Sequence, residues 1–365
     1  MSNIVTFQPL MQQNQETRLS ALITAVVDGR HGANDVYWLK EVAELLGVLA
    51  SSGACLPCGA LDPLQEFYDR IEDRLHFFPQ YYRFLLSICL DLEDLGIKGR
   101  RGQALCDWVA DHKFAQAEMS DLQRAEARRL LCRRGVGAPV DAGQLGARLH
   151  RFMSRPATFA LPNKKAAYEL THVVFYLSDY GHRKAVVSDD ALLGLHYAGI
   201  LAHLDQDMDL LAEVCAALTL VKTPVPSVWT RAITESYRQI DLFADQNASL
   251  SDGYHLFLVT RWALGLMGAE PELAQIPAGQ LRFSLPDLAV RPLHGMSESL
   301  HDMGAARQSD WQRMRGHVLA YLAPEAQAIL AEAEGATPYF ETFFECFSRA
   351  TLATGPMPRS VRSGG

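Results

Sequence analysis

The sequence lacks an uninterrupted apolar run long enough to cross a bilayer, although 48% of its 365 residues are hydrophobic. It opens MSNIVTFQPLMQQNQETR, and therefore also lacks the basic start and adjoining apolar segment of a signal peptide. These two absences predict a cytoplasmic protein without a membrane partner.

Positive charge is in short supply as well, because the formal net charge is -8. A nucleic-acid partner is not expected, since such proteins present a basic surface to the phosphate backbone. The most basic segment is RAEARRLLCRRG, at 125–136. We interpret it as a solvated helix face.

Cysteine is scarce, and its distribution excludes a disulfide framework. The seven cysteines are an odd number and most are scattered through apolar segments. Only Cys55 and Cys58, in ACLPCG, are closely spaced. They could be ordinary loop thiols, a redox pair or half of a metal site, although structural zinc usually needs a second pair.

The strongest pattern present is helical. Apolar residues recur at spacings of three and four along almost the whole chain, whereas period-two alternation is hard to find, so we predict an all-α fold. Start signals such as Ser188 and stop signals such as Gly181 delimit the helices. The predicted helices are 14–28, 34–51, 62–76, 79–95, 100–113, 119–134, 140–153, 164–180, 188–203, 209–221, 226–246, 252–268, 308–321, 323–334 and 337–351.

Short connections between these helices favour consecutive antiparallel hairpins, which build either an open solenoid or a closed ring. No consensus recurs at a fixed period, so we expect an α/α-toroid-like or globular helical array. The expected parts are an N-terminal helical layer (1–153), central apolar helices with a His/Asp/Arg cluster (154–268), a loop-rich arm (269–306), C-terminal helices (307–352) and a disordered tail (353–365).

The predicted helix 164–180 carries an unusual polar stripe. At 100° per residue, Glu169, His172, Tyr176 and Asp179 lie on one side of the helix, with no Lys or Arg among them. Ordinary solvated faces mix both signs of charge. The stripe therefore faces a polar pocket, or it faces solvent and lacks Lys and Arg only by chance.

The predicted helix 188–203 is apolar nearly all round, which indicates burial. His196 and His203 are seven residues apart and share a face with Gly199. Because glycine costs a helix roughly 1 kcal/mol relative to alanine, we expect another backbone or a ligand to approach here closely. Each histidine could instead be a buried imidazole that is hydrogen-bonded to a neighbour.

Arg261 interrupts another apolar helix, 252–268. A buried guanidinium needs a carboxylate, so we expect either a bridge between helices or an anion clamp for a substrate. The candidate partners are Asp179, Asp190 and Asp207.

Three alternating aspartates, Asp205, Asp207 and Asp209, resemble the start of a calcium loop. The later glycine and glutamate of such a loop are replaced by Leu210 and Ala216, which excludes an EF-hand. We expect Asp207 or Asp209 to cap the helix that follows.

Three stretches resemble an uncharacterised bacterial all-helical family, a domain of unknown function: FFPQYYRFLLSICLDLEDLG (77–96), SDLQRAEARRLLCRRGV (120–136) and YELTHVVFYLSDYG (168–181). The resemblance covers most of residues 35–270 and implies no catalytic residues. The hairpin arrangement is also similar to that of α/α-toroid proteins such as terpene and lanthionine cyclases. The chain lacks the aspartate-rich motifs of the former and the Cys-His zinc pattern of the latter.

Two functions follow as hypotheses. The first is a helical interaction or scaffold protein that binds a protein partner through the arm at 269–306 or the basic face at 122–134. The alternative is an enzyme that modifies a small molecule or peptide in a pocket between helices 164–180, 188–203 and 252–268. Its predicted catalytic residues are Glu169, Tyr176 and Arg261, and a Zn or Fe ion could be held by His172, Asp179, His196 and His203. Because every one of these residues also has a structural explanation, the interaction protein is the first hypothesis.

Overall fold

The computed structural model describes residues 10–33, 35–285 and 290–350. These residues form nineteen α-helices, α1–α19, and one two-stranded sheet, which confirms the predicted helical class. The tail predicted for 353–365 lies outside the described residues. None of the described helices is long and apolar enough to cross a membrane.

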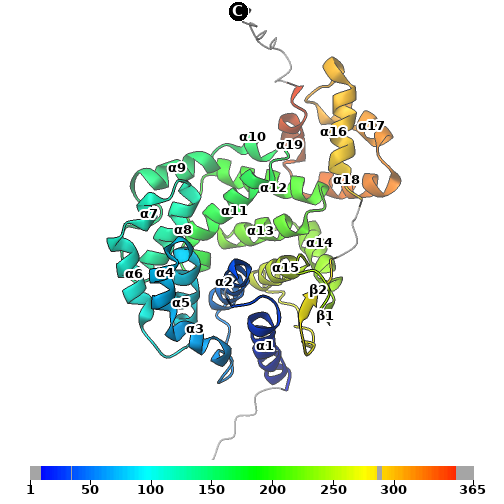
Figure 1. Ribbon diagram of the computed structural model, residues 1–365. Coiled ribbons are helices and arrows are strands. Elements are labelled where there is room, and N and C mark those ends of the chain that lie inside the picture. Colours follow the sequence, from blue (N-terminus) through cyan, green and yellow to red (C-terminus); the bar gives the residue numbers. More distant parts are fainter. Residues whose placement is uncertain (1–9, 34, 286–289, 351–365) are drawn as a thin grey trace, which may run out of the picture.

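Six helices contact one another in chain order, and the sixth also contacts the first (Figure 1). We call this set the helix circuit. Its members are α2 (Val36–Ser51), α5 (Tyr82–Asp94), α8 (Asp121–Cys132), α11 (Lys164–Ser178), α13 (Met208–Leu220) and α15 (Tyr254–Leu266). Other helical segments lie between consecutive members in the sequence.

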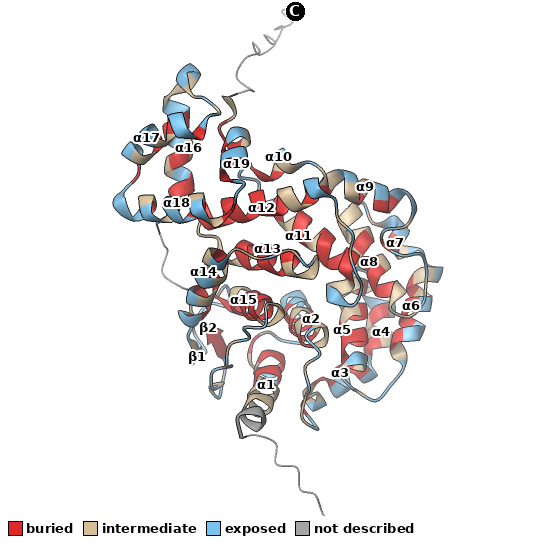
Figure 2. Cartoon of the chain, turned by 180° about the vertical axis from the view of Figure 1, so that it is seen from behind, coloured by how far each residue is buried: buried red, intermediate tan, exposed pale blue. Residues whose placement is uncertain are grey.

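One helix precedes the circuit, and further helices connect its members in the sequence. They comprise α1 (Leu10–Gly29), α3 (Gln65–Asp69), α4 (Ile71–Phe77), α6 (Arg101–Asp111), α7 (Phe114–Ala117), α9 (Gly143–Met153), α10 (Pro156–Phe159), α12 (Asp189–Leu204) and α14 (Ser227–Arg238), with the 3-10 turns η1 (Asp62–Leu64) and η2 (Pro79–Tyr81). Helix α12 packs on α13 and is covered by α10 and by two C-terminal helices, α18 (Pro324–Ala336) and α19 (Phe340–Phe347). This double covering explains why its sequence is apolar nearly all round, and Figure 2 shows α12 and α13 largely buried.

The C-terminal part contains the three helices predicted at 308–321, 323–334 and 337–351, and one that was not predicted. It contains α16 (Pro292–Asp302), η4 (Gly304–Ala306), α17 (Trp311–Tyr321), α18 (Pro324–Ala336) and α19 (Phe340–Phe347). Helix α16 lies inside the arm that we expected to be loop-rich. Its proline, which suggested a loop, instead occupies the first helical turn, where a missing N–H costs nothing.

The only sheet in the described part of the chain was not predicted. Strands β1 (Leu242–Ala244) and β2 (Leu281–Phe283) pair antiparallel, with Phe243 opposite Arg282. Residues 242–244 were assigned to the end of a helix, but α14 stops at Arg238. Three-residue strands are too short to produce a recognisable alternation.

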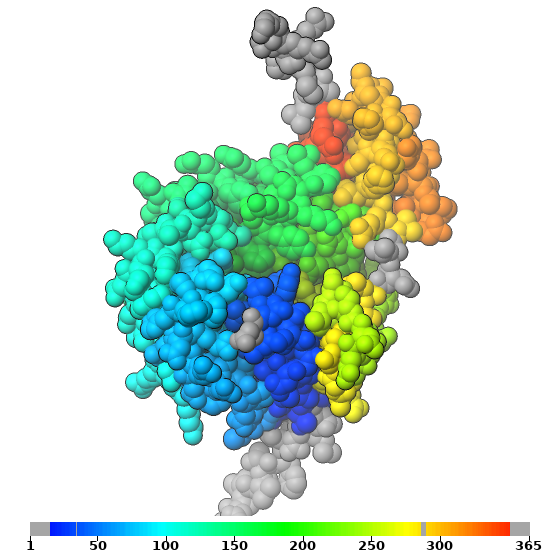
Figure 3. Space-filling model, viewed as in Figure 1, coloured from blue at the N-terminus to red at the C-terminus, as the bar shows by residue number. Residues whose placement is uncertain are grey.

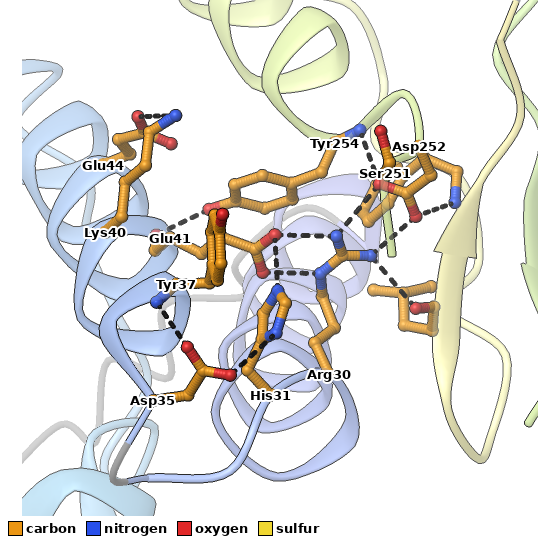
Figure 4. Close-up of polar contacts among 12 residues, drawn as sticks. Arg30, His31, Asp35, Tyr37, Lys40, Glu41, Glu44, Ser251, Asp252 and Tyr254 are labelled. Carbon is orange, nitrogen blue, oxygen red and sulfur yellow. Dashed lines mark hydrogen bonds and ion pairs between the residues drawn. The ribbon is translucent and has the colours of Figure 1, made fainter. Parts of the chain in front are cut away.

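A buried arginine fastens the start of the circuit to its end (Figure 4). Arg30, just after α1, has a side chain with no exposed surface. Its guanidinium donates to both carboxylate oxygens of Glu41 on α2, at 2.6 and 2.8 Å. It also donates to both oxygens of Asp252, just before α15, at 2.8 and 2.9 Å.

The same guanidinium reaches the sheet. It donates to the carbonyl of Leu281 at 3.1 Å and lies over the rings of Tyr254 and Phe283. A buried guanidinium is tolerated only when its charge and its donors are satisfied, as they are here. Arg30 therefore ties the N-terminal hairpin to α15 and β2, and Figure 3 shows the N-terminal residues (blue) seated between the cyan and yellow parts of the chain.

Candidate functional site

All six circuit helices contribute side chains to one cavity of about 310 Å³. Each of these helices provides at least one ionisable side chain: Lys40 and Glu44 from α2, Arg83 and Asp91 from α5, Glu126 and Arg129 from α8, His172 from α11, Glu213 from α13 and His255 from α15. An ordinary core at the centre of packed helices would be apolar. The charged lining therefore distinguishes this space from a packing defect.

Two of the arginines are neutralised within the protein. Arg83 lies 3.0 Å from Glu118 and 2.5 Å from Glu126. Arg133, at the end of α8, lies 2.7 Å from Asp91 and 2.6 Å from Asp94. The basic segment at 125–136 is thus not simply the solvated face that the sequence suggested, because Arg133 and Arg134 pair with carboxylates of α5.

Arg129 is less completely paired. Its side chain is 9% exposed, and Nη1 donates to Oδ1 of Asp179 at 3.1 Å. That is its one hydrogen bond to the described residues, and its buried Nε has no acceptor among them. The guanidinium carbon lies 4.9 Å from the ring centre of Tyr180 and 5.9 Å from that of Tyr176, so the tyrosine faces supply further stabilisation.

A left-handed turn brings Tyr180 to this arginine. Helix α11 ends in the 3-10 turn η3 (Asp179–Gly181), where Asp179, Tyr180 and Gly181 have φ of 45°, 52° and 101°. Left-handed backbone costs a non-glycine residue roughly 1–2 kcal/mol. Such strain persists only where surrounding contacts compensate for it, and the contacts of Arg129 with Asp179 and Tyr180 do so.

His172 faces the cavity with one nitrogen engaged. Nδ1 lies 2.8 Å from the carbonyl oxygen of Tyr168 and 3.4 Å from Oε2 of Glu213, which also accepts from Thr171. Burial alone would lower the pKa of His172, but the Glu213 carboxylate outweighs it and raises the pKa to about 9. The imidazolium is therefore the neutral-pH form, and Nε2 makes no hydrogen bond to a described residue.

His255 belongs to a second chain of polar contacts at the cavity wall. Its Nδ1 lies 2.8 Å from Oδ1 of Asp209, whose other oxygen accepts from Tyr168 at 2.7 Å. Burial opposes protonation, but Asp209 raises the pKa of His255 to about 9. Its Nε2 is 3.7 Å from Glu44, and burial raises the pKa of that carboxyl.

An aromatic wall adjoins the charged groups. The ring of Phe175 is centred 5.0 Å from that of Trp262 and 5.6 Å from that of Tyr180. His172 and Tyr176 continue the series, with ring centres 5.9 Å apart. Aliphatic and aromatic side chains complete the apolar lining: Val48, Phe84, Leu258 and Val259.

Three of the seven predicted site residues meet in this cavity: His172, Tyr176 and Asp179. His172 and Tyr176 lie one turn apart on α11, as the helical periodicity predicted, whereas Asp179 follows the helix in the left-handed turn η3. The other predicted residues of the catalytic set lie elsewhere. Glu169 is 3.9 Å from Lys165, and Arg261 binds Glu270 and the carbonyl of Pro271. The carboxylate that we expected beside Arg261 is therefore present, but it is none of the three proposed aspartates.

The two histidines of α12 lie away from His172 and Asp179. His196 packs on Tyr339 and Trp229, and His203 lies 3.9 Å from Glu332. Burial lowers the pKa of both imidazoles, which favours their neutral forms. The group that approaches Gly199 closely is the indole of Trp229, since an added Cβ would lie 2.3 Å from Cη2 of that ring.

The four predicted metal ligands thus do not converge, because His172 and Asp179 line the cavity whereas His196 and His203 lie on α12 outside its lining. Throughout the described ranges, no group of three or more His, Cys, Asp or Glu side chains is arranged to hold a metal ion. Cys55 and Cys58 are exposed free thiols in the loop after α2. Asp207 caps α13 by accepting from the amide of Leu210, as expected.

Sequence reasoning missed most of the lining. Glu213 and Asp91 were detectable, because each is an acid with apolar neighbours on both sides in a largely apolar stretch of helix. Arg129 gave no such signal, since it is one of several arginines in α8. Tyr180 was the last residue of the predicted helix 164–180, but it lies in the left-handed turn η3, which only the tertiary structure reveals.

Comparison with protein families places residues 1–350 in a family described as a domain of unknown function, DUF6902. The match extends beyond the part in which the sequence resemblance was recognised, and the chain belongs to this family. Searches of curated proteins and of solved structures found no match.

Proposed function

We propose that this member of the DUF6902 family is an enzyme that binds a small polar molecule in the central cavity and acts on it by proton transfer. The observation that carries the proposal is the contribution of ionisable side chains by all six circuit helices to one cavity. Arg129, Asp91 and Glu213 among them are mostly buried, and burying charge is costly unless it is paired or used. Concave sites with a few convergent polar groups are the usual form of small-molecule sites.

The proposed architecture is the α/α-toroid-like ring expected from the hairpin pattern. Its support is the sequential contact of α2, α5, α8, α11, α13 and α15 and the return contact between α15 and α2. In such a ring the inner helix faces meet around an axis. A ligand site on that axis would be reached by side chains from every inner helix.

His172 is the proposed proton donor. Its Nδ1 is held by the carbonyl of Tyr168 and by Glu213, which leaves Nε2 directed at the cavity space. A pKa of about 9 keeps this imidazole protonated at neutral pH, which is the form that a general acid requires. The nearby Tyr176 hydroxyl would orient the group that receives the proton.

Filling the cavity tests the binding part of the proposal. A Cβ added at Gly47 on α2 would lie 3.6 Å from Oδ2 of Asp91, an ordinary contact, so the longer side chain of Gly47→Met can extend into the cavity without a backbone clash. Gly316→Met on α17 is the matched control, because an added Cβ there meets no atom within 4 Å. Both changes gain up to roughly 1 kcal/mol of helix propensity.

We expect ligand-observed NMR with a set of small polar fragments to find binders that Gly47→Met loses and Gly316→Met retains. If every fragment that binds does so equally to both variants, a ligand site in the cavity is refuted. For catalysis, a pooled metabolite library is incubated with wild type and with His172→Gln. If wild type and the Gly316→Met control consume a compound that His172→Gln does not, the result supports the enzyme. Equal consumption by His172→Gln would show that His172 is not the acid.

A further inference from the structure

The unused hydrogen-bonding groups on one wall of the cavity are donors. The hydroxyls of Tyr176 and Tyr180 make no hydrogen bond to the residues that the structure describes, and burial raises the pKa of both phenols, so they remain protonated. Arg129 uses one N–H on Asp179. The remaining donor is Nε2 of His172.

These donors lie close together. The guanidinium carbon of Arg129 is 4.9 Å from the ring centre of Tyr180 and 5.9 Å from that of Tyr176, and the His172 ring is centred 5.9 Å from Tyr176. Tyr176 is 6% exposed, and its hydroxyl has no hydrogen-bond partner among the described residues. The Nε of Arg129 is buried and has no acceptor among them either. Leaving a buried donor unsatisfied costs about 1–3 kcal/mol, which a ligand acceptor would recover.

The carboxylates of the cavity are, by contrast, already occupied. Glu126 accepts from Arg83, and Asp91 accepts from Arg133. Glu44 lies 3.6 Å from Lys40 and 3.7 Å from His255, so its charge is balanced inside the protein. A ligand cation would have to displace one of these internal partners.

The rest of the lining is largely apolar. Trp262, Leu258 and Val259 on α15 line the cavity with Val48 on α2 and Phe175 on α11, and the rings of Trp262 and Phe175 are in contact, with centres 5.0 Å apart. Such a surface suits a hydrocarbon or aromatic body. The indole N–H of Trp262 is buried without a partner among the described residues.

We infer that the ligand of this cavity is a small aromatic or apolar molecule with one anionic oxygen group, a carboxylate or a phosphate, which accepts from Arg129, Tyr176, Tyr180 and His172. This inference rests on the proposed function and specifies its substrate class. Arginine and phenol donors around one anionic group form charge-assisted hydrogen bonds, which are stronger than neutral ones.

The test compares probes of matched shape that differ in one group. Phenylacetate and phenyl phosphate are anionic, phenylacetamide is neutral, and phenethylamine is cationic. Saturation-transfer NMR measures their binding to wild type, to Gly47→Met and to the double variant Tyr176→Phe/Tyr180→Phe, with Tyr321→Phe, whose side chain is exposed, as the control.

We expect at least one of the two anions to bind wild type at least tenfold more tightly than the amide and the amine. Its affinity should fall at least tenfold in the double tyrosine variant and be unchanged in Tyr321→Phe. Preference for phenylacetate over phenyl phosphate, or the reverse, identifies the anionic group. Circular dichroism of the double variant establishes that any loss is not unfolding.

Two results separate the failure of this inference from failure of the proposed function. If neutral or cationic probes bind as well as the anions and Gly47→Met removes them all, the cavity is a ligand site but the inferred anion preference is wrong. If Gly47→Met changes the binding of none of the fragments or probes, both this inference and the proposed function fail.

Discussion

Nδ1 of His172 lies 3.4 Å from Oε2 of Glu213, and this pair joins two helices of the circuit across 41 residues of sequence. Burial of the imidazole opposes its charge, whereas the carboxylate favours it and prevails. The protonation state of the proposed acid is therefore set by a residue of a different helix.

Glu213→Gln should lower the pKa of His172 from about 9 towards the ordinary value of 6.5, because the amide keeps the hydrogen-bond acceptor for Thr171 but not the charge. Titration of the His172 ring proton by NMR measures the shift. His255, whose protonation depends mainly on Asp209, is the internal control. An unchanged pKa at His172 would contradict the assigned cause.

Stability should be greatest near pH 6.5. His172 and His255 have pKa values of about 9, above their ordinary 6.5, so their contribution is complete below pH 6.5 and is lost as the pH rises to about 9. His196 and His203 have lowered pKa values, so their protonation destabilises the fold as the pH falls below 6.5. Unfolding midpoints across this range provide the measurement. A midpoint that keeps rising between pH 6.5 and 9 would disagree with these signs.

Arg30→Met should lower the free energy of unfolding by about 3–5 kcal/mol, because it leaves Glu41 and Asp252 buried without their cation. Arg18→Met is the comparison, since the Arg18–Glu272 pair is partly exposed and its loss should cost less than about 1 kcal/mol. Urea unfolding of both variants measures the difference. Equal effects would show that Arg30 does not fasten the circuit.

Gly199→Ala should destabilise the protein by about 1–3 kcal/mol, although alanine is the better helix former. The new methyl group would lie 2.3 Å from the ring of Trp229, which is fully buried and has no free space to move into. Gly335→Ala on α18 meets nothing within 4 Å and should stabilise by up to about 1 kcal/mol. Opposite signs for the two changes in thermal unfolding are the expected result.

Much of the helical content could be predicted because it depends on local patterns. The spacing of apolar residues located α11, and Asn163 and Ser188 cap α11 and α12 through their own side chains. The same periodicity placed His172, Tyr176 and Asp179 on one face. The short β1–β2 pair and α16 escaped prediction, because three-residue strands carry no period and a proline at a helix start reads as a loop.

The sequence by itself determined the helical class, several of the caps and the polar face of α11, since these follow from backbone geometry over a few residues. Only the tertiary structure decided what that face meets: Arg129 lies 50 residues before Asp179, and Glu213 lies 41 residues after His172. It likewise separated His196 and His203 from the cavity by placing α12 outside α13. Side-chain partners depend on which helices pack together, and a buried arginine such as Arg30 finds its carboxylate 222 residues away.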